Sequence, residues 1–435
     1  MKLKAGAAQV DISPVDSQFL YGYPHVERFS KGIHDPLLAS ALFLDDGLTK
    51  VLFIGNDILY VPKANVKNAR RRISIETGIA PDNIMITATH THSGPKTIDV
   101  MCSEADPVIP KADMQYVQLM EDGIVKAGIE AYDSAQVAKI GLAIADDTGV
   151  GTNRRAPEGP ADHNVPVLMV KSADGVKNIA CMLVCSMHPT VMHEDSKLAS
   201  GDFPGLSRKY LQENVLGKDC VVVHHSGPCG NQSPRHVTKA NTFEEAYRLG
   251  RILGTAVEKV LPKIEYQDEL TLNVSKQLTD LPKRNFPPVE EAKNKLDKSI
   301  ERLKSLRKNN APSTEVRTAE CDWFGAEETY TLSKAAADGR LKKVYEETLP
   351  AEIQILSIGK WNFVGWPGEI FVEYSLEVKD KSDNTFIISL ANGELQGYIV
   401  TEQANQEGGY EASNSLFSYK SGKVLVKKTL EMLSK

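Results

Sequence analysis

The sequence predicts a mixed α/β (α+β) fold with a strand-rich core, flanking helices and a charged helical insertion. Three observations predict it. Apolar runs of strand length alternate with amphipathic stretches along the 435 residues. Several of these runs end in histidine or another polar residue. One long segment is highly charged and has the spacing of solvated helices.

The first 261 residues supply most of the expected core. Apolar runs bounded by turn residues indicate buried strands. The expected strands are 51–57, 83–92, 139–145, 165–171, 178–188 and 220–227. Apolar residues three and four positions apart indicate helices that bury one face. The expected helices are 65–78, 114–132, 207–216 and 243–261.

The charged segment is expected at 287–347, where a helical pair laid over the domain can also shape the mouth of a pocket. Strands return within 352–368 and 385–393, and a helix over 423–435 closes the chain. The sequence contains neither an internal repeat nor a low-complexity linker. We therefore expect one domain over 1–435, with 287–347 as an insertion within it.

Composition narrows the function classes. A net charge of −6 gives no basic surface for nucleic acid, and no run of about 18 apolar residues predicts a membrane span. The six cysteines form no C-x-x-C pair and are expected to be mostly free thiols. The N-terminal residues lack the apolar stretch of a signal peptide. A cytoplasmic location is expected for the chain as it stands, and a periplasmic or secreted one if a leader has been removed.

Polar side chains collect where five apolar runs end. In open α/β sheets, ligands bind beyond the carboxyl ends of strands, so these ends can converge on one site. The residues concerned are His90 and His92, His188 and His193, His224, His225 and Ser233, Glu369, and Tyr398.

The H-T-H motif at 90–92 has the most chemical content. On an extended strand, residues i and i+2 face the same side, so both rings can point into one cavity. One ring can then bind a metal while the other acts on substrate, or both can bind metal. Imidazole nitrogen and carboxylate oxygen are common zinc ligands. The S-G-P that follows and the later M-H-P favour a functional site over a pair of structural histidines.

Three further residues are ambiguous when taken alone. Ser233 lies in a turn rich in Gly and Pro, where serine more often caps the backbone than acts as a nucleophile. Arg154 belongs to a loop and gains a role only if it reaches the crevice, where it can hold a carbonyl or carboxylate. Tyr410 follows two glycines and is either a packing residue or a hydroxyl donor.

Taken together, the motifs resemble the neutral/alkaline, non-lysosomal ceramidase family, specifically its N-terminal catalytic domain. A-T-H-T-H-S-G-P, M-H-P-T, N-R, G-x-x-S-P, P-G-E and G-Y…Y occur in that order. The resemblance begins at 7–14 and extends to Tyr410, which is nearly the whole chain. It implies hydrolysis of an N-acyl (amide) bond by metal-activated water, with one zinc ion per chain and a small-molecule or lipid-like substrate such as a sphingolipid.

The resemblance also implies roles for eight residues. Four would be zinc ligands: His90, His188, Glu369 and Tyr398. Four would act on or contact the substrate: His92 and Arg154 at the scissile amide, Ser233 at the site, and Tyr410 at the substrate. A second divalent ion could use Asp11, Asp57 or Asp202, although a capping role is the expectation for Asp57.

Departures from the family pattern support an alternative function. Asn231 stands where the family usually has aspartate, and Lys96 and Thr97 stand where glycines are common. The sequence as given is also expected to lack the family's immunoglobulin-like C-terminal domain. The alternative is a zinc enzyme on the same scaffold that acts on an ester, a lactone or a carbohydrate derivative, including by elimination. An apolar pocket would favour the amide hydrolase, and one lined by Arg, Lys and Asn would favour the alternative. A non-catalytic binding protein would be expected to have lost ligands, and this sequence retains all four.

Overall fold

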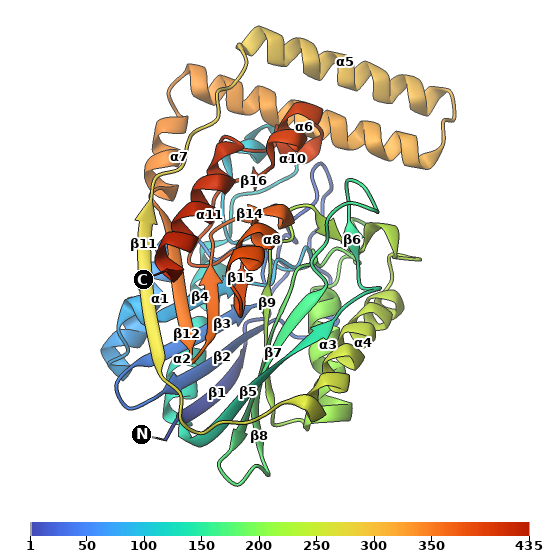
Figure 1. The fold of residues 1–435 in the computed structure, drawn as a ribbon. Coiled ribbons are helices and arrows are strands. Elements are labelled where there is room, and N and C mark those ends of the chain that lie inside the picture. The colour runs from blue at the N-terminus through green and yellow to red at the C-terminus, as the bar shows by residue number, and fades with distance from the viewer. Residues whose placement is uncertain (1, 435) are drawn as a thin grey trace.

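The computed structural model describes residues 2–434 and shows two packed sheets between outer layers of helices (Figure 1). The larger sheet has the order β4-β3-β2-β1-β5-β7-β8-β9. Its strands are β1 (Lys4–Asp11), β2 (Leu38–Asp45), β3 (Lys50–Asn56), β4 (Ile84–Ala88), β5 (Gln136–Asp146), β7 (Asn164–Ser172), β8 (Asn178–Cys185) and β9 (Val221–Ser226). The smaller sheet contains β11 (Leu272–Thr279), β12 (Ala351–Ile358), β13 (Trp361–Gly365) and β15 (Thr385–Ile388).

Two short ladders and a set of helices complete the fold. The ladders pair β6 (Thr152–Asn153) with β10 (Gln232–Ser233), and β14 (Glu369–Ile370) with β16 (Tyr398–Ile399). The longer helices are α1 (Lys63–Thr77), α2 (Met114–Asp133), α3 (Asp202–Leu211), α4 (Phe243–Val260), α5 (Val289–Lys308), α6 (Ser313–Ala337), α7 (Leu341–Thr348), α8 (Val372–Lys381) and α11 (Lys420–Leu433). The short ones are α9 (Glu402–Glu407) and α10 (Tyr410–Ser413). The predicted mixed α/β class is confirmed.

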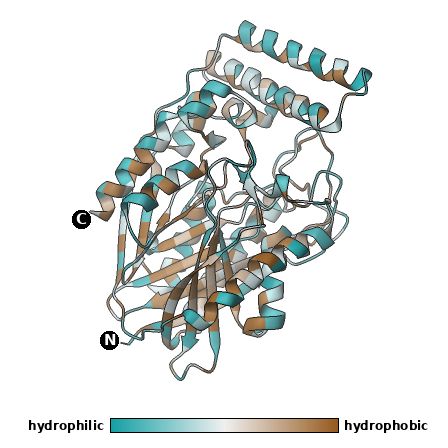
Figure 2. Cartoon of the chain, turned by 45° about the vertical axis from the view of Figure 1, so that its right-hand side comes forward, coloured by the Kyte–Doolittle hydropathy of each residue, from teal (hydrophilic) through white to brown (hydrophobic). Residues whose placement is uncertain are grey.

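Alternating side chains on the strands create the layers. In β2, Leu42 and Leu44 enter the core between the two sheets, whereas Ala41 and Phe43 pack with residues of α1 and α2. This is the period of two expected for a strand that is buried on both faces. Helices α3 and α4 cover β7, β8 and β9 through a further cluster, and α7, α8 and α11 cover the outer face of the smaller sheet. Figure 2 shows the strands as the most hydrophobic part of the chain.

The larger sheet curls so that its last strand, β9, packs against β2, β3 and β4. Gly55 permits this approach, because a Cβ atom there would lie 2.5 Å from the carbonyl oxygen of His224. Within residues 2–434, four strand pairs are parallel: β3 with β4, β8 with β9, β13 with β15, and β14 with β16. Parallel strands end at the same edge of a sheet, so their polar ends face a common space.

The charged segment forms α5, α6 and α7, and α5 packs along α6 at one end of the molecule, away from the main sheet (Figure 1). Hydrophilic residues dominate α5 (Figure 2), while α6 contacts α10 and buries Phe324 and Glu328. Among residues 2–434, no helix is both long and apolar enough to cross a membrane.

Several boundaries differ from the sequence-based expectations. The strands expected within 352–368 are the hairpin of β12 and β13, whereas helix α3 begins at Asp202 rather than at Ser207. The strand expected over 83–92 ends at Ala88. Apolar composition predicts burial, but chain reversals are set by turn geometry, which a hydrophobic pattern does not reveal.

We predict that a buried ion pair between Asp57 and Arg208 stabilises the junction of β3 and α3. The Oδ2 atom of Asp57 accepts hydrogen bonds from Arg208 Nη2 at 2.7 Å and from the Leu38 amide at 3.0 Å. Asp57→Ala leaves a buried guanidinium unpaired and should lower the free energy of unfolding by about 3–5 kcal/mol, as measured by chemical denaturation. Asp133→Ala, at an exposed position, should change it by less than about 0.5 kcal/mol. Equal effects would contradict the prediction.

Candidate functional site

The H-T-H motif faces one cavity, but not for the reason that the sequence suggested. Because β4 ends at Ala88, the motif is not on an extended strand. His90 has a φ of 69°, a left-handed conformation that is uncommon for a residue with a side chain. The turn brings the His90 and His92 ring centroids to 5.1 Å of each other and places both near His188, at 4.7 and 5.8 Å.

Three acceptor atoms meet in this cavity. Glu369 Oε2 lies 3.2 Å from His90 Nε2 and 3.1 Å from His188 Nε2. The opposite nitrogens face backbone carbonyls: His90 Nδ1 lies 3.0 Å from Leu59 O, and His188 Nδ1 lies 2.5 Å from Cys229 O. A carbonyl only accepts hydrogen bonds, so each Nδ1 carries the proton and each Nε2 of a neutral ring presents a lone pair.

This arrangement fits a bound cation. Burial lowers the pKa of His188 to about 4, which makes its ring neutral at pH 7. Burial alone would raise the pKa of Glu369, but His90 and His188 hold it well below its usual range when their rings carry protons. A cation facing the neutral rings would favour the charged carboxylate in the same way. Lone pairs that converge at about 3 Å repel one another unless a cation lies among them. Two imidazoles and a carboxylate, with Nδ1 atoms fixed by carbonyls, form the donor set and outer shell typical of zinc.

Tyr398 is placed beside this cluster by the short parallel ladder of β14 and β16. In that ladder Glu369 is the register partner of Tyr398. Burial and the nearby Glu369 raise the pKa of Tyr398 well above its usual value. Tyr60, which the sequence reasoning missed, donates a hydrogen bond to Glu369 Oε1. Tyr60 could have been predicted from its position four residues after β3. Because β3 runs parallel to β4, the residues that follow both strands lie at the same edge of the sheet.

His92 differs from the other two histidines. Neither of its ring nitrogens has a hydrogen-bond partner among residues 2–434, although both are shielded from solvent. Burial, together with His90 and His188, holds the pKa of His92 well below its usual value. Its backbone carbonyl accepts a hydrogen bond from Arg28, and its ring packs edge-on against Tyr23. His92 is therefore fixed in place while its nitrogens stay available to a ligand.

Arg154 and Ser233 are brought together by the β6–β10 ladder. Glu411, a second residue missed by the sequence reasoning, accepts hydrogen bonds from Arg154 Nε and Arg155 Nη1 at 2.8 and 2.9 Å. This leaves Arg154 Nη2 buried without a partner in the described chain. Ser233 Oγ accepts a hydrogen bond from the Arg235 amide at 3.3 Å, which is the capping geometry.

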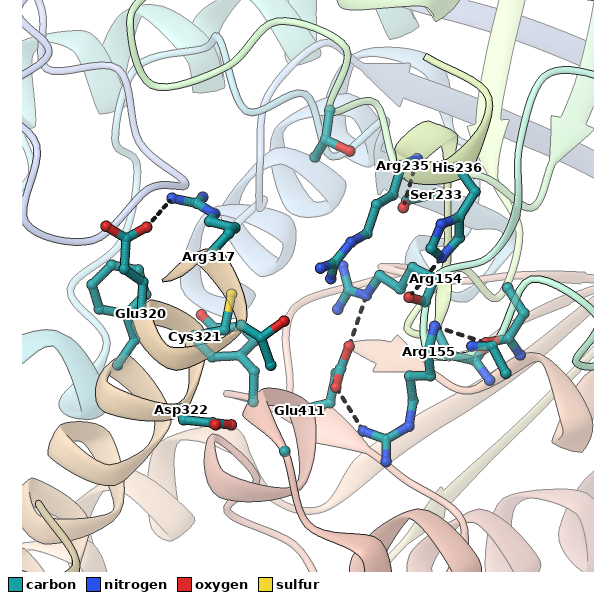
Figure 3. A pocket seen from close by; sticks show the side chains of 18 of the residues that line it. Arg154, Arg155, Ser233, Arg235, His236, Arg317, Glu320, Cys321, Asp322 and Glu411 are labelled. Atoms are coloured by element: carbon teal, nitrogen blue, oxygen red, sulfur yellow. Dashed lines mark hydrogen bonds and ion pairs between the residues drawn. The ribbon is translucent and has the colours of Figure 1, made fainter. Parts of the chain in front are cut away.

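Two cavities share His92, Tyr398 and Tyr410 in their walls. One has a volume of about 1650 Å³ and is lined by Arg154, Ser233 and many charged residues of α6 and neighbouring loops (Figure 3). The other has a volume of only about 70 Å³ and is bounded by His90 and Glu369. Tyr410 O–H donates to Glu328 Oε1 at 3.5 Å, and both residues line the small cavity.

The remaining candidates have structural contacts. Asn231 Oδ1 accepts a hydrogen bond from the Val372 amide, and Asn231 Nδ2 donates to Glu373. Asp202 accepts from the Met192 and Phe203 amides. The ligand nitrogens of His90, His92 and His188 lie within 4.8 Å of one another, and Glu369 Oε2 lies within 3.2 Å of two of these rings. Asp11, Asp57 and Asp202 are not part of such a cluster.

Comparison with known proteins agrees with the motifs. Residues 3–239 match the family model described as neutral/alkaline non-lysosomal ceramidase, N-terminal. The chain belongs to this ceramidase family. Neutral ceramidases A and B of Dictyostelium discoideum are each 24% identical to it, over 220 and 230 residues. These matches cover 46% and 49% of this chain, and about a third of the length of the two relatives: 30% and 32%.

Solved structures extend the similarity across the whole fold. The crystal structure of neutral ceramidase from Pseudomonas aeruginosa has a TM-score of 0.77, with 18% identity, 99% of this chain covered and 74% of that chain. A ceramidase complexed with C2 gives a TM-score of 0.75, with 17% identity, 98% of this chain covered and 74% of that chain. At these identities the similarity shows a shared ceramidase fold, and the resemblance predicted from sequence is confirmed.

We predict that Tyr60 supports metal binding through Glu369. Tyr60→Phe removes the hydroxyl that donates to Glu369 Oε1, so the carboxylate loses the group that orients it. Affinity for added zinc should fall about 10- to 100-fold, as measured by competition with a chromophoric chelator. Tyr116→Phe is the matched control, because the buried Tyr116 hydroxyl contacts the Ile12 carbonyl away from the cluster and should leave zinc affinity unchanged. An unchanged affinity in Tyr60→Phe would refute the role.

Proposed function

We propose that this chain is a zinc-dependent hydrolase that cleaves an N-acyl (amide) bond. The observation that carries the proposal is the convergence of His90 Nε2, His188 Nε2 and Glu369 Oε2, three acceptors with no donor between them. Tyr398, the register partner of Glu369, would complete the ligand set. Membership of the ceramidase family supports an amide as the bond that is cleaved.

Zinc held there would polarise the acyl carbonyl and lower the pKa of a water molecule toward about 7. Side chains of the protein would transfer the proton and stabilise the negative charge. His92, with both nitrogens free of partners, would take the proton released by water and pass it to the leaving nitrogen. Arg154 would donate from its unpartnered Nη2 to the acyl oxygen as negative charge develops there. Glu411 would orient Arg154 through Nε.

Ser233 and Tyr410 would contact the substrate. Ser233 lines the large cavity, and its hydroxyl makes no hydrogen bond to another side chain within residues 2–434. Tyr410 borders both cavities, so its hydroxyl lies where the two parts of a substrate would meet. We assign both to substrate positioning.

A second candidate function is favoured by the wall of the large cavity. Arg, Lys and Asn side chains line it, including Arg155, Lys239 and Asn241. Such groups bind sugars and carboxylates better than alkyl chains. A zinc enzyme acting on an ester, a lactone or a carbohydrate derivative would use the same metal ligands and the same polar cavity.

We predict that metal binding and turnover can be separated by substitution. His90→Ala removes a ligand and should abolish both bound zinc and activity. His92→Ala should keep about one zinc per chain, while kcat falls about 100- to 10,000-fold because proton transfer is lost. Metal content by mass spectrometry and turnover on the same samples test this. Stoichiometric zinc in His90→Ala would show that the ligand assignment is wrong.

We also predict chelator-sensitive cleavage of an amide by the purified protein. Fluorescent short-chain ceramide and an ester of the same fluorophore would be incubated before and after zinc removal. Amide cleavage that is lost on chelation and restored by zinc supports the amidohydrolase. Cleavage of the ester alone, with zinc bound, supports the second candidate instead.

A further inference from the structure

The two cavities that meet at His92 differ in size, wall chemistry and rigidity, and this asymmetry bears on the substrate. The small cavity, about 70 Å³, has room for about five non-hydrogen atoms. His90 and Glu369 border it, so a bound ion would take part of that space. The large cavity, about 1650 Å³, exceeds the usual size of a small-molecule pocket.

The walls of the small cavity suit an uncharged group. Most of them are apolar or aromatic: Tyr21, Leu59, Tyr60, Val100, Cys102 and Ile109. Glu328 also lines it, with Oε2 unpartnered within the described chain, and burial raises the pKa of this carboxyl well above its usual value. Besides Glu328, Glu369 is the acidic residue that lines this cavity. The cavity therefore accommodates a short neutral chain better than a charged one.

A pinned loop forms one wall of the small cavity. Residues 96–110 carry Val100, Cys102 and Ile109 over it. Lys96 holds both ends of this loop, because its buried Nζ donates to Asp99 Oδ1 and to Pro110 O, each at 2.7 Å. Thr97 Oγ1 donates to Tyr60 O at 2.6 Å. These contacts resist the outward movement that a longer chain in the cavity would need.

The large cavity suits a polar group. Arg154 pairs with Glu411 through Nε, but its Nη2 is buried there without a partner in residues 2–434, and the exposed Arg235 lines the same cavity. Both side chains point into the cavity (Figure 3). A long alkyl chain placed against them would leave Arg154 Nη2 without a partner and would take the exposed Arg235 out of water, which is unfavourable. Polar oxygens of a substrate would satisfy them.

From these observations we propose that the enzyme removes a short acyl group, held in the small cavity, from a polar amine held in the large one. The proposal rests on the amide hydrolysis proposed above and names its substrate class. Water adds to the acyl carbon, the C–N bond breaks, and the products are a short carboxylic acid and a free amine. No other reactant is needed.

The test is a chain-length series on one polar amine. Zinc-loaded protein would be assayed with acetyl, butanoyl and octanoyl amides of 7-amino-4-methylcoumarin-3-acetate, which carries a carboxylate and fluoresces when released. We expect kcat/KM for the octanoyl amide to be at least about 100-fold below that for the acetyl amide, because one misfit methylene in a closed pocket costs about 10–200-fold. Equal rates would overturn the chain-length limit while leaving amide hydrolysis in place.

If the small cavity sets the limit on acyl chain length, a variant that enlarges this cavity should accept longer chains. Ile109→Ala enlarges that cavity and should raise the octanoyl-to-acetyl ratio of kcat/KM about 10-fold. Val316→Ala is the matched control, since Val316 lines the large cavity and its truncation should leave the ratio unchanged. A ratio that responds to Val316→Ala and not to Ile109→Ala would place the acyl chain in the large cavity and overturn the proposal.

Two further measurements distinguish the preference for the amine from the preference for the acyl group, and effects on binding from effects on turnover. N-acetylsphingosine has a short acyl chain on a lipid amine, and we expect it to be cleaved more slowly than the acetyl amide of the polar amine; faster cleavage would overturn the polar half of the proposal. In calorimetry, acetohydroxamate should bind the zinc-loaded protein at least about 10-fold more tightly than octanohydroxamate. If neither these amides nor ceramide is cleaved while zinc is bound, amide hydrolysis itself fails, and this inference fails with it.

Discussion

The convergence of Glu369 with the Nε2 atoms of His90 and His188 constrains much of the surrounding structure. An unpaired buried charge would cost far more than most single contacts provide, so the protein must fix three acceptors against mutual repulsion until a cation is present. It does so with backbone groups: the carbonyls of Leu59 and Cys229 hold the two rings. Those carbonyls follow β3 and β9, which is why the curl that brings β9 against β3 matters for the site.

The sequence predicted part of the set that gathers, because the positions of these residues follow from strand chemistry. His224 and His225, which it grouped with the others, border neither cavity. Apolar runs identify strands, and polar residues at their carboxyl ends mark a shared edge, as with His188 after β8. The sequence did not predict how these residues are brought together. The left-handed conformation of His90 and the register of Glu369 with Tyr398 depend on contacts between segments far apart in the sequence. No periodicity in the chain encodes them.

The residues that sequence reasoning missed share one property: each supports a candidate rather than belonging to a motif. Tyr60 contacts Glu369, and Glu411 orients Arg154. Glu328 belongs to α6, within a segment whose charge made a solvated surface the natural interpretation. In the structure the same helix turns Arg317 toward the large cavity, where it pairs with Glu194 and Glu320 (Figure 3). A charged helix can thus be a cavity wall as well as a surface.

The departures from the family pattern have different physical consequences. Asn231 Oδ1 accepts a hydrogen bond from the Val372 amide at the start of α8, and this contact does not involve the metal cluster. Lys96 instead fixes the loop over the small cavity, and its buried ammonium meets a half-exposed Asp99, so the contact depends on the loop staying closed. A change that leaves the ligands intact while fixing the wall beside them alters which substrate fits, and not the chemistry that the ligands support. Family membership and substrate choice are therefore set by different residues of this chain.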